Sequence, residues 1–405
     1  MNFDITVDRT KTNSVKWNKG AIESISANPD ALPFWVADMD FPPEPHIQAK
    51  AKEMADSGVY GYPVFDKFSS IAASWLEKKH GWTVDSSHVL YTMGLLHGIA
   101  LAIDLFTKVG DKILVPSPTY RPFRELCLRS DRIMHDYELG YRSGEFYLDR
   151  ERFDAMASES KMILFCSPHN PSGLVFSRDD LKFVLETAKK YDIPVVSDEI
   201  HADLVHTGVE HLPMGKANEN IGAKCITYLA PSKTFNVAGE HSAIAIFSDE
   251  DMEKTFKKKQ SALWLTSPGF LIGELTQVAY QDGLDYNLEL CSYLKGNADF
   301  IREFLKSNCP EIVLANGNAS FVTFLDCSAI YDKIEKKVLS NPERYKGGAG
   351  GGILSRFFGV EAGIAMNDGT WFGEQYKDYV RINYGTSRAL VQDALEKMAK
   401  AVKAL

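Results

Sequence analysis

Apolar positions along this 405-residue chain form two kinds of pattern. Short uninterrupted apolar runs, typical of buried strands, occur at 89–92, 112–115, 162–165, 194–197, 225–230 and 243–247. Amphipathic stretches between and before these runs predict helices at 46–57, 67–79, 95–108 and 178–191. Because the strands show no polar alternation and helices separate them, we expect an α/β fold with a mostly parallel sheet covered on both faces.

The beginning of the chain shows a weaker pattern. Residues 1–45 contain several prolines, which predicts an irregular, extended arm that packs on its own body or on a neighbouring subunit. Near the other end, the glycine-rich segment 341–352 is predicted to be a mobile loop.

A long helical pattern at 285–308 leads into the last part of the chain. Two more strands are predicted at 321–325 and 379–383, and a terminal helix is predicted from about residue 390. The length allows two cores. We therefore expect an N-terminal arm at 1–45 that joins the small domain, a large domain at 46–285, and a small C-terminal α+β domain at 286–405.

Charge and composition exclude some partners. A net charge of −9 argues against nucleic-acid binding, and the basic run 257–259 is a solvated helix face. No run reaches the roughly 18 apolar residues of a membrane span, and the N-terminus lacks a signal-peptide pattern. The six cysteines form no Cys-x-x-Cys pair, and several lie in apolar runs, so we expect reduced, buried thiols and a cytoplasmic protein.

Four polar residues follow or end predicted strands: Tyr120, Asn170, Asp198 and Lys233. Ligands of parallel sheets bind beyond the carboxyl ends of the strands. Lys233 lies between an apolar strand and an apolar, glycine-ended segment, where the pKa of a lysine shifts readily; an ordinary solvated lysine is the alternative.

Each neighbouring signal has a simpler explanation as well. Gly94 precedes a helix and could expose N–H groups to an anion, or only form a strand–helix turn. Asn170 could bond only its own backbone in its proline-rich turn. Asp198 and Glu199 are adjacent on a strand and point opposite ways, so one can face a site. The Asp-Glu-x-His sequence lacks the further ligands of a metal site, and we expect no metal.

Together these residues meet the requirements of a pyridoxal phosphate site. That cofactor needs a lysine amine for covalent attachment and an acid that keeps its pyridine nitrogen protonated. A hydrogen-bond partner at the ring hydroxyl, an aromatic ring over the cofactor and N–H groups at the phosphate complete the site. Lys233, Asp198, Asn170, Tyr120 and the helix after Gly94 supply this set.

The chain resembles the fold-type I pyridoxal-phosphate enzymes of the class I/II aminotransferase superfamily. More narrowly, it is similar to the carbon–sulfur lyases of the cystathionine β-lyase and cystalysin type. The matching motifs are collinear over nearly the whole chain: VADMDF at 36–41, SPHNP at 167–171, SDEIH at 197–201, PSKTFN at 231–236 and VRIN at 380–383. The resemblance implies a fold-type I PLP-transferase with a seven-stranded sheet in its large domain.

The resemblance also implies a role for each matched residue. Lys233 would be the Schiff-base residue and proton carrier, and Asp198 would pair with the pyridine nitrogen. Asn170 would bond the ring hydroxyl, and Tyr120 would stack on the ring. The other implied residues are Gly94, Leu95 and Ser232 at the phosphate, Leu96 and His201 elsewhere in the cofactor site, Tyr62 at the phosphate of the other subunit in a homodimer, and Arg381 on the substrate α-carboxylate.

Departures from the family pattern occur at His97, at Glu240-His241 and at 386–388. Many aminotransferases have a phosphate-binding arginine at the position of His241, which we expect here to begin a strand and face solvent. We predict β-elimination of cystathionine or another S-substituted cysteine to pyruvate, ammonia and a thiol. The alternatives are an aminotransferase, which begins with the same proton removal, and a pyridoxal-phosphate-binding regulator that sequesters a transcription factor.

Overall fold

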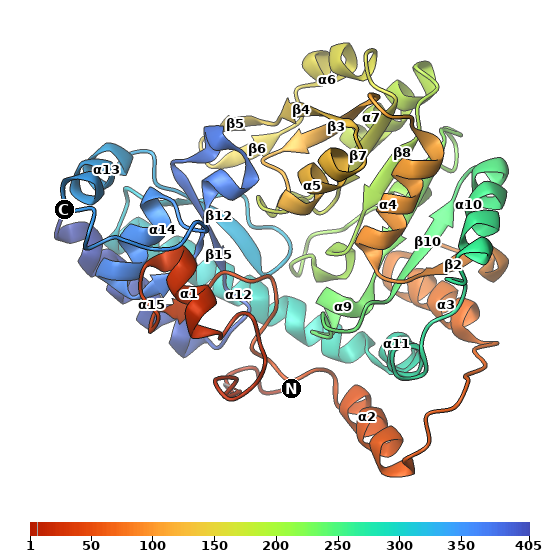
Figure 1. Cartoon of the computed structure of the whole chain (residues 1–405), viewed down its shortest axis with the longest axis horizontal. Helices are drawn as coiled ribbons and strands as arrows, with labels where there is room; N and C mark the ends of the chain where they lie inside the picture. The colour runs from red at the N-terminus through yellow and green to blue at the C-terminus, as the bar shows by residue number, and fades with distance from the viewer. Residues whose placement is uncertain (6) are drawn as a thin grey trace.

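The computed structural model describes residues 1–5 and 7–405, and it is built around one large and one smaller sheet (Figure 1). The large sheet has seven strands in the order β2-β10-β9-β8-β7-β3-β4. Of these seven strands, β10 alone runs in the opposite direction to the other six. The predicted seven-stranded, mostly parallel sheet is confirmed. Its strands are β2 (Val89–Thr92), β3 (Lys112–Ser117), β4 (Ile133–Glu138), β7 (Met162–Cys166), β8 (Val195–Asp198), β9 (Cys225–Leu229) and β10 (Ala243–Phe247).

Helices cover both faces of this sheet. Every residue of β7, β8 and β9 is buried, which explains why the strand sequences lack polar alternation. One face packs against α4 (Leu95–Phe106), α5 (Arg121–Arg129) and α10 (Glu250–Ala262). The other face packs against α3 (Phe68–His80), α6 (Arg150–Ala157), α7 (Arg178–Lys190) and α11 (Phe270–Asp282).

Local sequence signals set the ends of several helices. Ser177 and Asp180 form a capping box at the start of α7. Gly58 and Gly81 end α2 (Pro45–Ser57) and α3 with positive φ angles of 67° and 58°. A residue without a side chain adopts this left-handed conformation at little cost, so both helix ends could be predicted.

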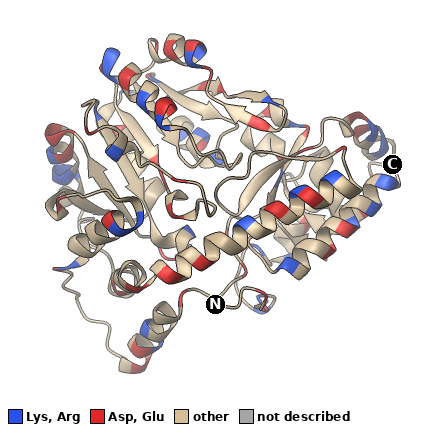
Figure 2. Cartoon of the chain, turned by 180° about the vertical axis from the view of Figure 1, so that it is seen from behind, with Lys and Arg blue, Asp and Glu red and all other residues tan. Residues whose placement is uncertain are grey.

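The smaller sheet is antiparallel and lies beyond α12 (Leu284–Asn308), the long helix that crosses the front of Figure 2 with acidic and basic residues interspersed along it. Its strands have the order β11-β12-β15-β14. The expected three-part division, with boundaries after residues 45 and 285, stays a prediction. The elements of this region are β11 (Val313–Leu314), β12 (Val322–Asp326), α13 (Tyr331–Ser340), α14 (Ile353–Phe357), β14 (Asn367–Asp368), β15 (Tyr379–Asn383) and α15 (Arg388–Lys403).

The N-terminal arm is more regular than predicted. It contains α1 (Lys19–Ser26), whose first turn is capped by the Asn18 side chain, and β1 (Leu32–Pro33), which pairs with β13 (Ile364–Ala365). The prediction of an irregular arm is wrong for these segments. A helix of eight residues is too short to show a clear period, and it is held by tertiary packing of its apolar residues under Trp35.

The glycine-rich segment 341–352 packs directly against α1. A side chain at Gly348 would collide with Ser24, and one at Gly351 would collide with the backbone of Ile25. This close approach of two backbones accounts for the glycines. The predicted mobility of the segment stays a prediction.

Candidate active site

The carboxyl ends of the parallel strands surround a cavity of about 360 Å³. Its walls come from the loops that follow β2, β3, β7, β8 and β9 and from Ala37 of the N-terminal arm. Nine of the eleven predicted site residues line it: Gly94, Leu95, Leu96, Tyr120, Asn170, Asp198, His201, Ser232 and Lys233. The other two, Arg381 and Tyr62, do not line it. The fold therefore brings together side chains that are up to 139 positions apart, from Gly94 to Lys233.

Lys233 lies on the short helix α9 (Pro231–Thr234), directly after β9. Its Nζ donates a hydrogen bond to the carbonyl oxygen of Ala37 at 2.5 Å. Burial lowers the pKa of Lys233 to about 8; the Asp38 and Asp198 carboxylates oppose this shift, and Arg381 adds to it. A sizeable fraction of neutral, nucleophilic amine is therefore present near pH 7 to 8.

Asp198 is the last residue of β8 and is buried, with one carboxylate oxygen accepting the Ile200 N–H at 3.0 Å. Burial raises the pKa of Asp198 to about 7, Glu199 adds to the rise, and Lys233 opposes it. Glu199 points away from the cavity, where it accepts hydrogen bonds from Ser197, His211 and Met214. The predicted opposite orientation of the two carboxylates is confirmed. A cation beside Asp198 would hold this buried carboxyl in its charged form.

Asn170 and Arg381 meet at one side of the cavity. The NH1 group of Arg381 donates to the Asn170 side-chain oxygen at 3.0 Å, and NH2 donates to the Trp35 carbonyl and to Asn367. Arg381 is 5% exposed, and its Nε has no hydrogen-bond partner among the described residues. Burial lowers the pKa of Arg381 to about 10, so the guanidinium stays charged at neutral pH. An unpartnered, buried N–H of this kind fits an anionic ligand such as a carboxylate.

Two ring-bearing residues complete the inner walls. Tyr120 caps α5 and lies half-buried in the cavity, and burial raises its pKa to about 12, so its hydroxyl is neutral. His201 is buried beside Ser320, whose hydroxyl lies 3.0 Å from its Nδ1. Burial and the nearby charges of Lys233 and Arg381 lower the pKa of His201 to about 3. His201 is therefore a neutral hydrogen-bonding group rather than a general acid.

The end of the cavity next to α4 suits an anion. Gly94 has a φ of 79°, and α4 begins directly after it without a side-chain cap, so the first N–H groups of the helix are open to a ligand. Ser242 also lines this cavity, and its buried hydroxyl has no partner among the described residues. A phosphate fits this end, because it would satisfy both the helix N–H groups and the hydroxyl.

Sequence reasoning missed Ser242 and left His241 unassigned. Both precede β10, and because β10 is antiparallel, its beginning lies where the parallel strands end. His241 is exposed, as predicted, but it lies two positions before the first residue of β10 instead of beginning the strand, and it packs beside Gly94 in the cavity wall. Tyr62 does not line the cavity; its side chain is fully exposed.

Residues 31–398 match the family described as aminotransferase class I and II. The chain is 31% identical to cystathionine beta-lyase PatB of Bacillus subtilis (strain 168) over 99% of this chain and 100% of that protein. It is 29% identical to cystathionine beta-lyase of Corynebacterium glutamicum over 92% of this chain and 94% of that protein. The solved structure of cystalysin from Treponema denticola, which contains pyridoxal 5'-phosphate, matches with a TM-score of 0.89 and 27% identity over 100% of this chain and 99% of that chain.

These likenesses extend over almost the whole chain, and they confirm the fold-type I architecture expected from the motifs. Four of the five motifs that carried the resemblance supply residues to the cavity walls, among them Asn170, Asp198, His201 and Lys233; the fifth, at 380–383, places Arg381 against Asn170. The chain belongs to the class I and II aminotransferase family.

Proposed function

We propose that this protein is a pyridoxal-phosphate-dependent carbon–sulfur β-lyase that converts cystathionine or a related S-substituted cysteine to pyruvate, ammonia and a thiol. The observation that carries the proposal is that the partly buried Lys233 and the buried Asp198 line one cavity. The 31% identity to a cystathionine beta-lyase along 99% of the chain favours the lyase reaction within the family.

Four residues would hold the cofactor ring. Lys233 would bind it covalently, Asp198 would pair with the pyridine nitrogen, Asn170 would bond the ring hydroxyl, and Tyr120 would lie over the ring face. When bound, pyridoxal phosphate withdraws electrons from the substrate Cα and makes the Cα proton removable. His201 and Leu96 complete this part of the site from the cavity wall.

The phosphate would lie at the start of α4. Leu95 would donate its backbone N–H, and Ser232 would donate its hydroxyl, with the unpartnered hydroxyl of Ser242 in the same cavity wall. Gly94, whose own N–H is donated to the Thr92 carbonyl, would let the phosphate approach the start of the helix closely. The positive end of the α4 dipole would stabilise the phosphate charge.

The substrate would be held by Arg381 and deprotonated by Lys233. The unpartnered Nε of Arg381 would gain a partner from the substrate α-carboxylate. An amine with a pKa of about 8 can take up the Cα proton and return a proton to the departing sulfur near neutral pH. Arg381 and Tyr120 would fix the orientation of the Cβ–S bond, and orientation of this kind can supply several kcal/mol, roughly 7–11 at most.

The enzyme would act as a cytoplasmic homodimer with shared active sites. Val59, Tyr60, Tyr62 and Val64 form an exposed, largely apolar loop next to α2, which projects from the body in Figure 1. A second copy would cover these side chains and receive Tyr62 at its phosphate. All six cysteines are free and buried, as expected for reduced thiols. In the described residues, no helix has both the length and the apolar character needed to cross a membrane.

Incubation with cystathionine, with and without an added keto acid, tests the reaction. A lyase releases pyruvate and free thiol in equal amounts without a keto acid. If cystathionine is consumed only when a keto acid is present, and that keto acid is recovered as an amino acid, the protein is an aminotransferase, the alternative that the family description favours. A protein that binds the cofactor without turnover of either kind would be the regulatory binder.

A further inference from the structure

Residues 36–41, here called the strap, lie across the catalytic lysine. The carbonyl of Ala37 in the strap accepts the hydrogen bond of Lys233. Asn236 follows Lys233 by three positions, just beyond the end of α9. Its side-chain oxygen accepts the Met39 N–H at 2.9 Å, and its side-chain nitrogen donates to the Met39 carbonyl at 2.9 Å. On the other side, the Asn383 side chain donates to two strap carbonyls. The position of the strap therefore decides what surrounds the Lys233 amine.

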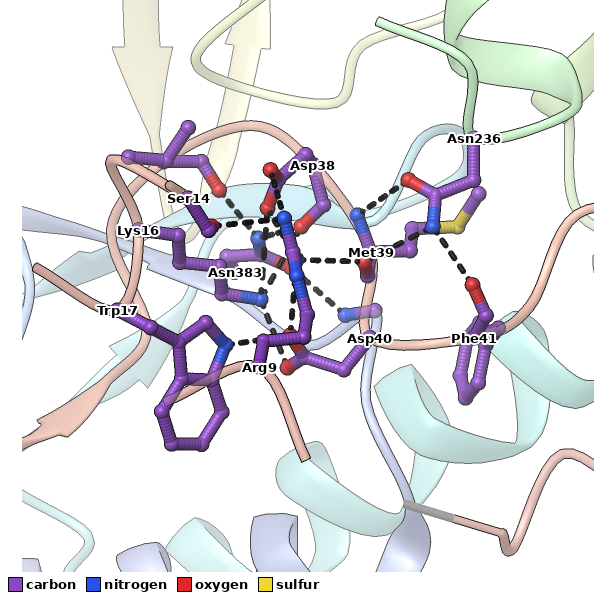
Figure 3. A network of polar contacts seen from close by, with 12 residues as sticks. Arg9, Ser14, Lys16, Trp17, Asp38, Met39, Asp40, Phe41, Asn236 and Asn383 are labelled. Atoms are coloured by element: carbon purple, nitrogen blue, oxygen red, sulfur yellow. Dashed lines mark hydrogen bonds and ion pairs between the residues drawn. The ribbon is translucent and has the colours of Figure 1, made fainter. Parts of the chain in front are cut away.

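A second segment holds the strap in place through charge (Figure 3). Arg9 grips Asp38 with two hydrogen bonds, NH2 to Oδ2 at 2.8 Å and NH1 to Oδ1 at 3.1 Å. Lys16 donates to Asp40 at 2.8 Å, and the indole of Trp17 donates to the same carboxylate at 3.0 Å. We call Arg9, Lys16 and Trp17 the N-terminal clasp.

Among the described residues, Arg9 and Lys16 each pair with both Asp38 and Asp40, at 2.8–3.9 Å. The two shortest of these four ion pairs, Arg9–Asp38 and Lys16–Asp40, differ in exposure. Lys16 and Asp40 are 1% and 3% exposed, so removal of either side chain would leave the other as a buried charge without this partner. Arg9 and Asp38 are 20% and 18% exposed and line a second cavity, of about 410 Å³, that shares Ala238 and Glu240 with the active site. The Arg9–Asp38 pair is thus the part of the clasp that lies next to the reaction.

We propose that Arg9 is a positioning residue of the active site, which acts through Asp38 on the proton affinity of the Lys233 amine. This inference rests on the role that the proposed function gives to Lys233. The clasp would make the N-terminal segment a component of the catalytic site rather than a structural appendage.

The charges around Lys233 support this assignment. The charged groups that act on the amine are Asp38 on the strap, Asp198 at the end of β8 and Arg381 on β15. The other titratable residues of the cavity wall are Tyr120, His201, His97, Cys166, Glu240 and His241. Asp38 makes the largest contribution that opposes the effect of burial on the Lys233 pKa. The bidentate guanidinium of Arg9 offsets part of the Asp38 charge and holds it in position.

The two partners should therefore have opposite effects on Lys233. Without Arg9, less positive charge offsets the Asp38 carboxylate, since Lys16 alone among the described residues remains paired with it. The strap is also held less tightly and admits water to the amine. Both changes raise the pKa of Lys233. Without the Asp38 charge, the ammonium loses its main stabilising anion and the pKa falls. A merely structural role would loosen the strap in both variants and shift the pKa the same way.

Competitive labelling of the cofactor-free full-length protein with acetic anhydride, read by peptide mass spectrometry across a pH series, measures the Lys233 pKa. Arg9→Gln should raise it by about 0.5–1 unit, and Asp38→Asn should lower it by about 0.5–1 unit. The double variant should behave like Asp38→Asn alone, because Arg9 acts through Asp38. In the loaded enzyme, the acidic limb of the kcat/KM profile should move in the same directions.

Lys19→Gln is the matched control, since it removes the exposed Lys19–Asp30 ion pair of the same N-terminal region and should leave the Lys233 pKa unchanged. If Arg9→Gln folds poorly, Arg9→Lys keeps the charge without the bidentate grip and should give a smaller rise. An unchanged Lys233 pKa in both single variants, or shifts in the same direction, would overturn the proposal. Labelling uses no substrate, so this result is independent of whether the protein is a lyase or an aminotransferase.

Discussion

Replacing Asp198 with asparagine should stabilise the cofactor-free protein while it abolishes most activity. Asp198 is 3% exposed, and burial raises its pKa from 3.8 to about 7. At neutral pH the folded chain therefore holds a charged carboxylate away from water, and the charge of Lys233 offsets only part of the cost of desolvation. Asparagine keeps the oxygen that accepts the Ile200 N–H, but it carries no charge.

The pH dependence follows from proton binding. The folded form keeps the Asp198 proton up to about pH 7, whereas the unfolded form loses it near pH 4, so the unfolded form binds fewer protons between these values. Stability thus falls as pH rises through this window, by up to about 4 kcal/mol for a shift of about three units. The advantage of Asp198→Asn over wild type should grow by about 2 kcal/mol between pH 5.5 and pH 8.

Urea unfolding of the cofactor-free proteins at the two pH values measures this difference. Glu199→Gln is a suitable control, because Glu199 is the adjacent buried carboxylate but accepts three hydrogen bonds, and its replacement should destabilise the fold. In the loaded enzyme, Asp198→Asn should lose far more than tenfold in rate, since the pyridine nitrogen loses its acidic partner. A variant that is no more stable than wild type at pH 8, or that keeps a tenth of the rate (a loss of ~1.4 kcal/mol), would refute the reasoning.

Three further predictions concern the other site residues. Lys233→Ala should bind the cofactor but form no borohydride-trapped adduct and lose at least about 10³-fold in turnover; a peptide map that places the adduct on another lysine would contradict the assignment. Arg381→Lys should lose about 10- to 100-fold in kcat/KM, with a smaller change in kcat, because one ammonium cannot replace the guanidinium fork that contacts Asn170 and Asn367. Steady-state kinetics measure both constants, and an unchanged KM would contradict this prediction. The protein should sediment as a dimer, and a monomer with full activity at nanomolar concentration would exclude the proposed sharing of Tyr62.

Much of the architecture could be predicted from local sequence. Six strands of the large sheet are almost entirely buried, so each appears as an apolar run, and the glycines and capping residues at helix ends act within one turn. The edge strand β4 is only partly buried and mixes polar with apolar residues, so no apolar run predicted it. Lys233, Asp198 and Asn170 follow such strands, and the geometry of parallel sheets predicts that these positions converge. The motifs around them also made the family recognisable before any contact was known.

The tertiary structure alone decided the rest, because contacts between distant segments depend on packing. Reversal of β10 brings Ser242 into the cavity wall, and no local signal marks that reversal. No local signal marks Arg9 or Lys16 in the sequence, yet folding places them on Asp38 and Asp40, 29 and 24 positions away. Burial then sets the pKa values of Lys233 and Asp198, since the loss of water around a charge is a property of the assembled cavity and not of the residue.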